Sequence, residues 1–221
     1  MARNKYPEET VQLILDVSLH LFIEKGYENT SIQDIINHLG GLSKGAIYHH
    51  FKSKEAIFEA VCVKLGGENA IFYNDIRDDT TKNGREKLKT LLAAACANPN
   101  NDALLAMTAK MLESPKFLMN LIEEAYHFVA PFYIEPILRQ GIADGSIQTD
   151  SPKELATLLI TMLNIWINPM IAKTTPPEME AKIRFMGTVL CRLGIDVIDE
   201  TIVAQYVHYC VRYHEVNDAT Q

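Results

Sequence analysis

The sequence is poor in features that would point to secreted or membrane proteins. It has 4 cysteines, which lie far apart, and the segment Met-Ala-Arg-Asn-Lys-Tyr-Pro at its start lacks the apolar run of a signal peptide. No stretch approaches the roughly 20 apolar residues that cross a bilayer. We therefore expect a cytoplasmic protein with free thiols and no membrane partner.

Motifs typical of enzymes are missing as well. The chain contains no Gly-x-Ser-x-Gly elbow, no phosphate-binding glycine loop and no closed set of metal ligands. His49 and His50 are adjacent, so they point to different faces of a helix and do not easily share an ion. We expect no catalytic residue, no metal and no other cofactor.

Positive charge is in short supply. Lys and Arg number 21 against 28 Asp and Glu, which gives a formal net charge of −7. Such a balance argues against indiscriminate coating of nucleic acid, because phosphate contacts come from basic surfaces. The segment up to Glu55 is nearly neutral, however, and the rest of the chain carries almost all the excess acid. Any contact with a polyanion should therefore be made by a local patch.

The stretch from Ser43 to Lys54 supplies such a patch. It reads Ser-Lys-Gly-Ala-Ile-Tyr-His-His-Phe-Lys-Ser-Lys and contains no acidic residue. Leu42, Ile47 and Phe51 are close to helical spacing and predict a short anchored helix. Its outward face would carry Lys44, Gly45, Tyr48 and His49, and the alternative is an ordinary solvated helix surface.

The preceding residues predict two further helices. Pro7 suits the first turn of one that ends at Gly26, and Thr30 or Ser31 can cap a second. Gly40 and Gly41 end the second helix. The resulting order of helix, glycine turn and helix is that of a helix-turn-helix unit.

From Ser53, a plausible helix cap, the chain shows helical patterns and no strand alternation. We expect breaks at Asn98–Asn101 and at Thr174–Pro177, a kink or break at Pro131 and Pro136, and a capping box from Ser151 to Glu154. Apolar periodicity predicts helices over the segments 88–95, 104–112, 114–129, 155–166, 179–190 and 199–213. The predicted fold class is all-α, with a helix-turn-helix domain over 1–55, a linking helix over 53–77 and a second helical domain over 56–221.

Several linked motifs at fixed spacing resemble the TetR family of one-component bacterial transcriptional regulators. They cover roughly Val11 to Leu65. The matching elements are Leu21-Phe22, Gly26-Tyr27, Thr30-Ser31-Ile32, Asp34-Ile35, Ser43-Lys44-Gly45, Ile47-Tyr48-His49-His50-Phe51 and Lys52-Ser53-Lys54-Glu55. The turn at Gly40-Gly41 is one residue longer than the spacing most common in that family.

The resemblance implies a homodimer that binds double-stranded operator DNA and a small-molecule effector. It places Lys44 at base edges, Gly45 and Ala46 at a close approach to DNA, Tyr48 and His49 on phosphate or sugar, and Lys54 on a phosphate. The complete set of expected DNA-binding residues is Thr30, Ser31, Gln33, Ser43, Lys44, Gly45, Ala46, Tyr48, His49 and Lys54. Two recognition helices about 34–36 Å apart, or a multiple of that, would require an inverted-repeat operator.

The second domain offers weaker candidates. His127, Asn164 and Trp166 mix apolar surface with polar groups and are expected at the effector site, although such residues at helical spacing often only fill a core. Cys210 and His214, near His208, have the i, i+4 spacing of metal or redox sites, and the alternative is a packed terminal helix. We expect dimer contacts from the helices over 151–170 and from Met179 or Ile202 onward.

The sequence thus predicts a transcriptional regulator, a repressor that leaves its operator when an effector binds. The alternative is a small-molecule-binding enzyme or carrier with an N-terminal helical module. Turnover of a bound metabolite without DNA affinity would favour that alternative.

Overall fold

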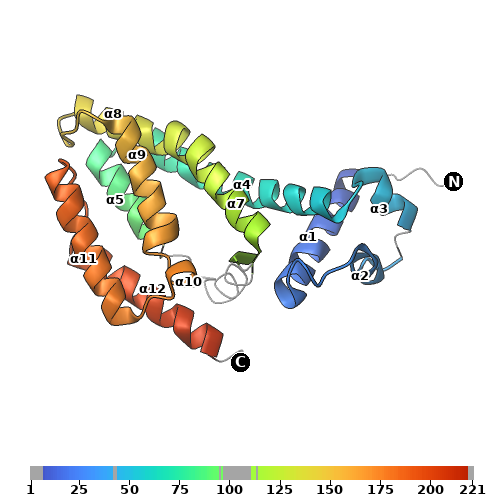
Figure 1. Ribbon diagram of the computed structural model, residues 1–221. Helices are drawn as coiled ribbons and strands as arrows, with labels where there is room; N and C mark the ends of the chain where they lie inside the picture. Colours follow the sequence, from blue (N-terminus) through green and yellow to red (C-terminus); the bar gives the residue numbers. More distant parts are fainter. Residues whose placement is uncertain (1–6, 42–43, 95, 97–110, 113, 219–221) are drawn as a thin grey trace. The chain divides into compact units, whose positions relative to one another are not determined.

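A computed structural model describes residues 7–41, 44–94, 96, 111–112 and 114–218. Every regular element in this part of the chain is a helix, which confirms the all-α fold class (Figure 1). Ser43, the loop Asn98–Asn101 and most of the helix predicted over 104–112 lie outside the described residues. No described helix is both long enough and apolar enough to span a bilayer.

The chain forms two compact units. The N-terminal unit comprises Met1–Asn69 and Met107–Asn120, and the C-terminal unit comprises Ala70–Ala106 and Leu121–Gln221. Helix α4, Lys54–Asp78, begins in the first unit and ends in the second. The division therefore falls inside the linking helix, whereas the sequence placed the boundary at its start.

The N-terminal unit contains α1 (Pro7–Lys25), α2 (Ile32–His38) and α3 (Lys44–His50), followed by the first part of α4. Pro7 and two glutamates open α1, where the helix dipole favours negative charge. Gly26 follows its end with a φ of +82°, as expected for a left-handed stop. Ser53 Oγ accepts the N–H of Ala56 at 3.2 Å, so Ser53 caps α4 as predicted.

One apolar core joins the helices of this unit. Ile14, Ile35, Ile47 and Ile57 are each 0% exposed and come from four different helices. Phe58 makes an edge contact with Phe22, with ring centroids 5.8 Å apart. Because Ile47 is held in this core, the opposite face of α3 is turned to solvent.

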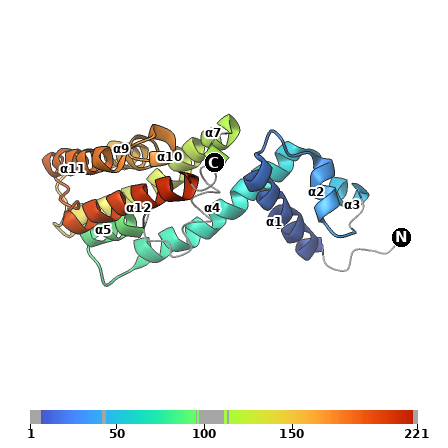
Figure 2. The same cartoon turned by 90° about the horizontal axis from the view of Figure 1, so that it is seen from below.

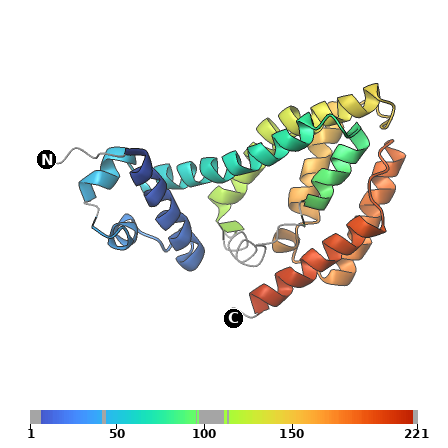
Figure 3. The ribbon, with the colours of Figure 1, turned by 180° about the vertical axis from the view of Figure 1, so that it is seen from behind.

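The C-terminal unit is built from helices of varied length and type. They are α5 (Gly84–Ala94), the end of α7 (Pro115–Glu124), η1 (Ala125–Ile134), α8 (Glu135–Ala143), α9 (Pro152–Thr161), η2 (Met162–Trp166), α10 (Pro169–Ala172), α11 (Pro176–Arg192) and α12 (Glu200–Asp218). Helix α11 packs along α12, as Figures 2 and 3 show from two sides. The predicted segments over 179–190 and 199–213 correspond to this pair.

Pro131 does not break the helix that contains it. The chain remains helical from α7 through η1 to α8, and the segment around Pro131 has π-helical hydrogen bonding. Of the kink or break predicted at Pro131, the break is absent, because a π-helix changes which N–H and C=O groups pair. The missing N–H of proline is thereby accommodated within a continuous helical path.

The capping box predicted from Ser151 to Glu154 is absent. Ser151 precedes α9 but makes no side-chain capping hydrogen bond. The box occurs instead at the start of α11, where the Thr175 N–H donates to the Glu178 carboxylate at 2.9 Å. The backbone explains the difference, since ψ is 159° at Thr175 and 59° at Ser151, and a capping residue needs an extended conformation.

Helices α5 and α8 approach each other very closely. A Cβ atom added at Gly84 would lie 2.4 Å from Gly141 Cα, so glycine is required where the two backbones meet. Beside this contact Lys87 is 3% exposed, and its ammonium group donates to Gln140 Oε1 at 2.6 Å and to Arg77 O at 2.5 Å. The buried charge is therefore satisfied by two oxygen acceptors.

Candidate functional site

Helix α2 is fixed at its start by reciprocal hydrogen bonds. Ser31 Oγ accepts the Asp34 N–H at 3.1 Å, while the Asp34 carboxylate accepts the Ser31 N–H at 2.8 Å and a bond from Lys25 Nζ at 3.2 Å. Hydrogen bonds from Ser31 and then from Lys25 lower the pKa of Asp34 to about 2. Ser31 is thus an exposed capping residue, and its contact with DNA stays a prediction.

Two other candidates on this side of the unit differ sharply in exposure. Thr30 is 1% exposed, and its hydroxyl donates to Gly26 O at 2.8 Å and Leu21 O at 3.2 Å. This buried side chain holds the turn between α1 and α2, and the contact of Thr30 with DNA stays a prediction. Gln33 is exposed, and its amide donates to Asn37 Oδ1 at 3.0 Å.

The turn between α2 and α3 begins with two glycines in left-handed backbone conformations. Gly40 has a φ of +60° and Gly41 a φ of +115°. A side chain at either position would meet no atom within 4 Å, so the requirement for glycine is conformational and not steric. The extra turn residue inferred from the sequence is compatible with this backbone.

Helix α3 presents the predicted recognition face. Lys44, Gly45, Tyr48 and His49 are all exposed, and Ala46 is half-buried. Lys44 Nζ lies 5.8 Å from the centroid of the Tyr48 ring, so the cation and the phenol share one face. This face combines a positive charge with hydrogen-bond donors, which is the chemistry that DNA phosphates and base edges accept.

Lys54 is tied to the turn after α1. Its ammonium group donates to Tyr27 O at 2.8 Å and lies 4.3 Å from the centroid of the Tyr27 ring. The Tyr27 hydroxyl in turn donates to Glu55 at 3.3 Å, and burial and that carboxylate raise the pKa of Tyr27 to about 12. The predicted phosphate contact of Lys54 remains a prediction, and these contacts hold its ammonium at the first turn of α4.

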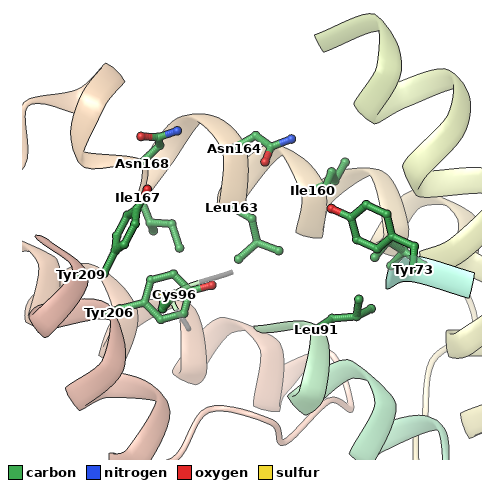
Figure 4. A pocket seen from close by; sticks show the side chains of 11 residues that line it. Tyr73, Leu91, Cys96, Ile160, Leu163, Asn164, Ile167, Asn168, Tyr206 and Tyr209 are labelled. Atoms are coloured by element: carbon green, nitrogen blue, oxygen red, sulfur yellow. The ribbon is translucent and has the colours of Figure 1, made fainter. Parts of the chain in front are cut away.

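The C-terminal unit encloses a cavity of about 150 Å³. Its described lining comes from α4, α5, η1, α9, η2, α12 and neighbouring turns, and several side chains point into it (Figure 4). Asn164, one of the three effector candidates, lines this cavity. Tyr73, Cys96, Tyr206 and Tyr209 also line it and were not predicted.

Two of the three effector candidates are not among the described residues that line the cavity. His127 is exposed on η1 and is not among the lining residues. Trp166 is on η2 but packs edge-on against Phe185, with centroids 5.9 Å apart, and Lys182 Nζ lies 6.0 Å from its ring centroid. The structure therefore leaves Asn164 as the candidate that lines the cavity.

On the terminal helix α12, Cys210 and His214 contact the same backbone carbonyl oxygen. Cys210 Sγ donates to Thr174 O at 3.1 Å, and His214 Nε2 lies 3.0 Å from the same carbonyl. Burial raises the pKa of Cys210 to about 11, which keeps the thiol protonated. Among the described residues no group of three potential metal ligands is assembled.

A family model for bacterial regulatory proteins of the tetR family matches residues 14–61. This range contains α2, the glycine turn and α3. Over this range the chain is similar to the TetR family. The match covers the described N-terminal helices that carry the candidate DNA-binding residues, in the order that the sequence motifs indicated.

Curated relatives match the chain over part of its length. YerO of Bacillus subtilis, an uncharacterized HTH-type transcriptional regulator, is 38% identical over 39% of this chain and 30% of its own length. The HTH-type transcriptional repressor KstR2 of Mycolicibacterium smegmatis is 29% identical over 64% of this chain and 69% of its own length. The chain thus spans less than a third of YerO and about two thirds of KstR2.

Solved structures of other proteins are similar in fold to most of this chain. Reduced Escherichia coli NemR gives a TM-score of 0.61 at 16% identity, covering 81% of this chain and 97% of NemR. A TetR-family regulator from Mesorhizobium loti gives a TM-score of 0.59 at 18% identity, covering 96% and 98% of the two chains. At these identities the comparison shows the shared fold alone.

Proposed function

We propose that this chain is a DNA-binding transcriptional regulator of the TetR family that acts as a homodimer in the cytoplasm. The observation that carries the proposal is the orientation of α3: Ile47 is fully buried, while Lys44 and Tyr48 are exposed together on the other face. A short helix anchored in this way fits the major groove, where phosphate contacts set its register and few side chains read bases.

Regulation is proposed to be release from the operator when a small molecule binds the C-terminal unit. The cavity supplies a place for that effector, and Tyr73, which lines it, belongs to the same helix as Lys54. Because α4 is continuous from Lys54 to Asp78, a movement of the part of α4 that lines the cavity can be transmitted along the helix to the first unit. An effector that binds more tightly to the dimer geometry that does not fit the operator shifts the protein towards that geometry. The fraction of protein bound to DNA then falls.

A mobility-shift assay with the DNA flanking the chain's own gene tests the proposal. Binding should weaken as salt rises, and it should weaken in both Lys44→Ala and Tyr48→Ala. Lys89→Ala and Tyr126→Ala serve as controls, because both residues are exposed in the C-terminal unit and should leave binding unchanged. Binding unaffected by both α3 substitutions would rule out this docking mode, and turnover of a metabolite without DNA binding would favour an enzyme.

Homodimerisation is proposed through α9, α11 and α12. Leu158 on α9 is 40% exposed and Phe185 on α11 is 58% exposed, so two of the expected helices carry large apolar side chains at the surface. Apolar surface of this kind is a feature of subunit interfaces. Two copies of α3 related by a twofold axis would read an inverted repeat.

A further inference from the structure

The cavity of the C-terminal unit carries information about the chemistry of its ligand. Its polar lining consists of phenols, amides and a thiol: Tyr73, Tyr206, Tyr209, Asn164, Asn168 and Cys96. No lysine, arginine, histidine or carboxylate is found among the described residues that line it. A charged ligand would therefore lose its hydration without gaining an opposite charge, which is strongly unfavourable.

One hydroxyl in this cavity has only a weak partner among the described residues. Tyr206 is 4% exposed, and its Oη makes no hydrogen bond of regular geometry to the described residues. The Cys96 thiol lies beside it, but a thiol is only a weak hydrogen-bonding group. In Figure 4 the Tyr206 hydroxyl points into the cavity, and the Tyr73 hydroxyl points into it from the opposite side.

Burial keeps these groups in their neutral, hydrogen-donating forms. It raises the pKa of Tyr206 well above its ordinary value and raises the pKa values of Tyr73 and Tyr209 as well. Burial also raises the pKa of Cys96 to about 12, so the thiol is not a reactive thiolate near neutral pH. Among the described residues, the cavity lining thus offers O–H donors to a ligand and no charged group.

The size of the cavity limits the ligand further. A cavity of about 150 Å³ is comparable to one that holds a benzene-sized molecule. Leu163 lies between the two inward-pointing hydroxyls, and Leu91 adds apolar surface below Tyr73 (Figure 4). A single ring or a similarly compact apolar group would lie against these leucines, and one polar atom would reach Tyr206.

We propose that the cavity binds an uncharged, single-ring organic molecule whose carbonyl oxygen accepts a hydrogen bond from Tyr206 Oη. This inference rests on the proposed function only in naming that molecule as the effector. The binding itself requires no DNA and is testable alone.

Three probes of nearly equal shape separate the requirements. Acetophenone is neutral and has a carbonyl acceptor, α-methylstyrene has a methylene group in place of the carbonyl oxygen, and benzoate has a negative charge. Isothermal titration with the full chain should show that acetophenone binds about tenfold more tightly than the other two, because one hydrogen bond to a buried donor is gained. Acetophenone alone should clearly raise the melting temperature.

Variants then locate the contact. Tyr206→Phe should remove the roughly tenfold preference for acetophenone over α-methylstyrene, since it deletes only the donor. Tyr126→Phe is the matched control, because this tyrosine is exposed, bonds to Thr161 and does not line the cavity. Leu163→Phe should abolish binding of both neutral probes by filling the space, which gives a second variant that leaves every cavity hydroxyl in place.

The outcomes discriminate clearly. Equal affinity for benzoate and acetophenone, an undiminished preference in Tyr206→Phe, or no binding of any of the three probes would overturn the proposal. If acetophenone binds as expected but does not release operator DNA, the ligand inference stands and the proposed regulation fails. If Lys44→Ala loses DNA binding while all three probes fail to bind, the regulator stands and the inference fails.

Discussion

Lys87 is a buried, charged residue that stabilises the C-terminal unit through hydrogen bonds to two other helices. Its ammonium group has two oxygen acceptors, and one of them is a carbonyl near the end of α4. We expect Lys87→Met to lower the free energy of unfolding by about 1–3 kcal/mol, because it leaves buried acceptors without donors. Urea denaturation measures this change.

Lys89→Met provides the control for that measurement. Lys89 is on the same helix but 47% exposed, where it pairs with Asp199. An exposed ion pair contributes about 0–1 kcal/mol, so this variant should be nearly as stable as the wild type. Equal losses in the two variants would show that burial of Lys87 is not what matters.

Asp34 gives a prediction for acid conditions. Its pKa in the folded chain is lowered to about 2 by hydrogen bonds from Ser31 and Lys25, so ionised Asp34 stabilises the fold above its ordinary pKa of about 4. The difference in unfolding free energy between wild type and Asp34→Asn should be constant above about pH 4 and should shrink as the pH falls towards 2. Denaturation at a series of pH values measures it, and a difference that grew on acidification would contradict the assignment.

Residues that act through local spacing could be predicted from the sequence, and residues that act across the fold could not. The exposure of Lys44 and Tyr48 follows from the apolar anchor Ile47 between them. The tether of Lys54 depends on the carbonyl of Tyr27, whose position is set only when α1 and α4 pack. Tyr206 was missed for the same reason, because its cavity is assembled from several distant helices.

At the scale of helices, the close contact between α5 and α8 leaves no room for a side chain at Gly84. Gly84→Ala would place a Cβ atom 2.4 Å from the backbone of Gly141, and neither main chain can rotate away as a side chain would. We expect a loss of about 1–3 kcal/mol or more, as in overpacked cores. The melting temperature of the purified variant measures the effect.

Gly145→Ala separates packing from backbone conformation. Gly145 has a φ of +76°, but a Cβ atom there meets nothing within 4 Å. This variant should lose only about 1–2 kcal/mol from left-handed strain. A larger loss here than at Gly84 would place the limiting strain in the turn after α8.

The helix starts show why a local pattern is not sufficient to predict a cap. Ser151-Pro-Lys-Glu and Thr175-Pro-Pro-Glu have the same arrangement of capping residue and glutamate, yet only the second forms the hydrogen-bonded box. The choice depends on ψ of the capping residue, which the preceding chain path determines. The existence and order of the helices, by contrast, could be predicted because apolar periodicity is a property of each segment.

At the scale of the whole molecule, the proposed dimer is tested by charge placed on α11. Phe185→Glu should convert a dimer to monomers, because a carboxylate would be buried without a partner at an apolar contact. Phe128→Glu is the control, since Phe128 is similarly exposed at 61% but lies on η1, outside the proposed interface. Analytical ultracentrifugation distinguishes the two states, and a dimer that survives Phe185→Glu would exclude this face.

The same dimer predicts a symmetric DNA site. Removing one half of the inverted repeat should weaken binding far more than changing the spacer sequence. Only one of the two recognition helices then has a half-site to bind. Fluorescence anisotropy with full and half sites measures this difference. Equal affinity for both would mean that each chain binds alone.

The weakly partnered hydroxyl of Tyr206 links the proposed ligand binding to the stability of the fold. Replacing Tyr206 with phenylalanine removes a buried donor that lacks a good acceptor among the described residues, which should increase the free energy of unfolding by about 1 kcal/mol. Laboratory evolution for heat tolerance alone would therefore select variants that have lost the proposed ligand contact. Stabilising this chain while keeping that contact requires substitutions elsewhere, with position 206 held as tyrosine.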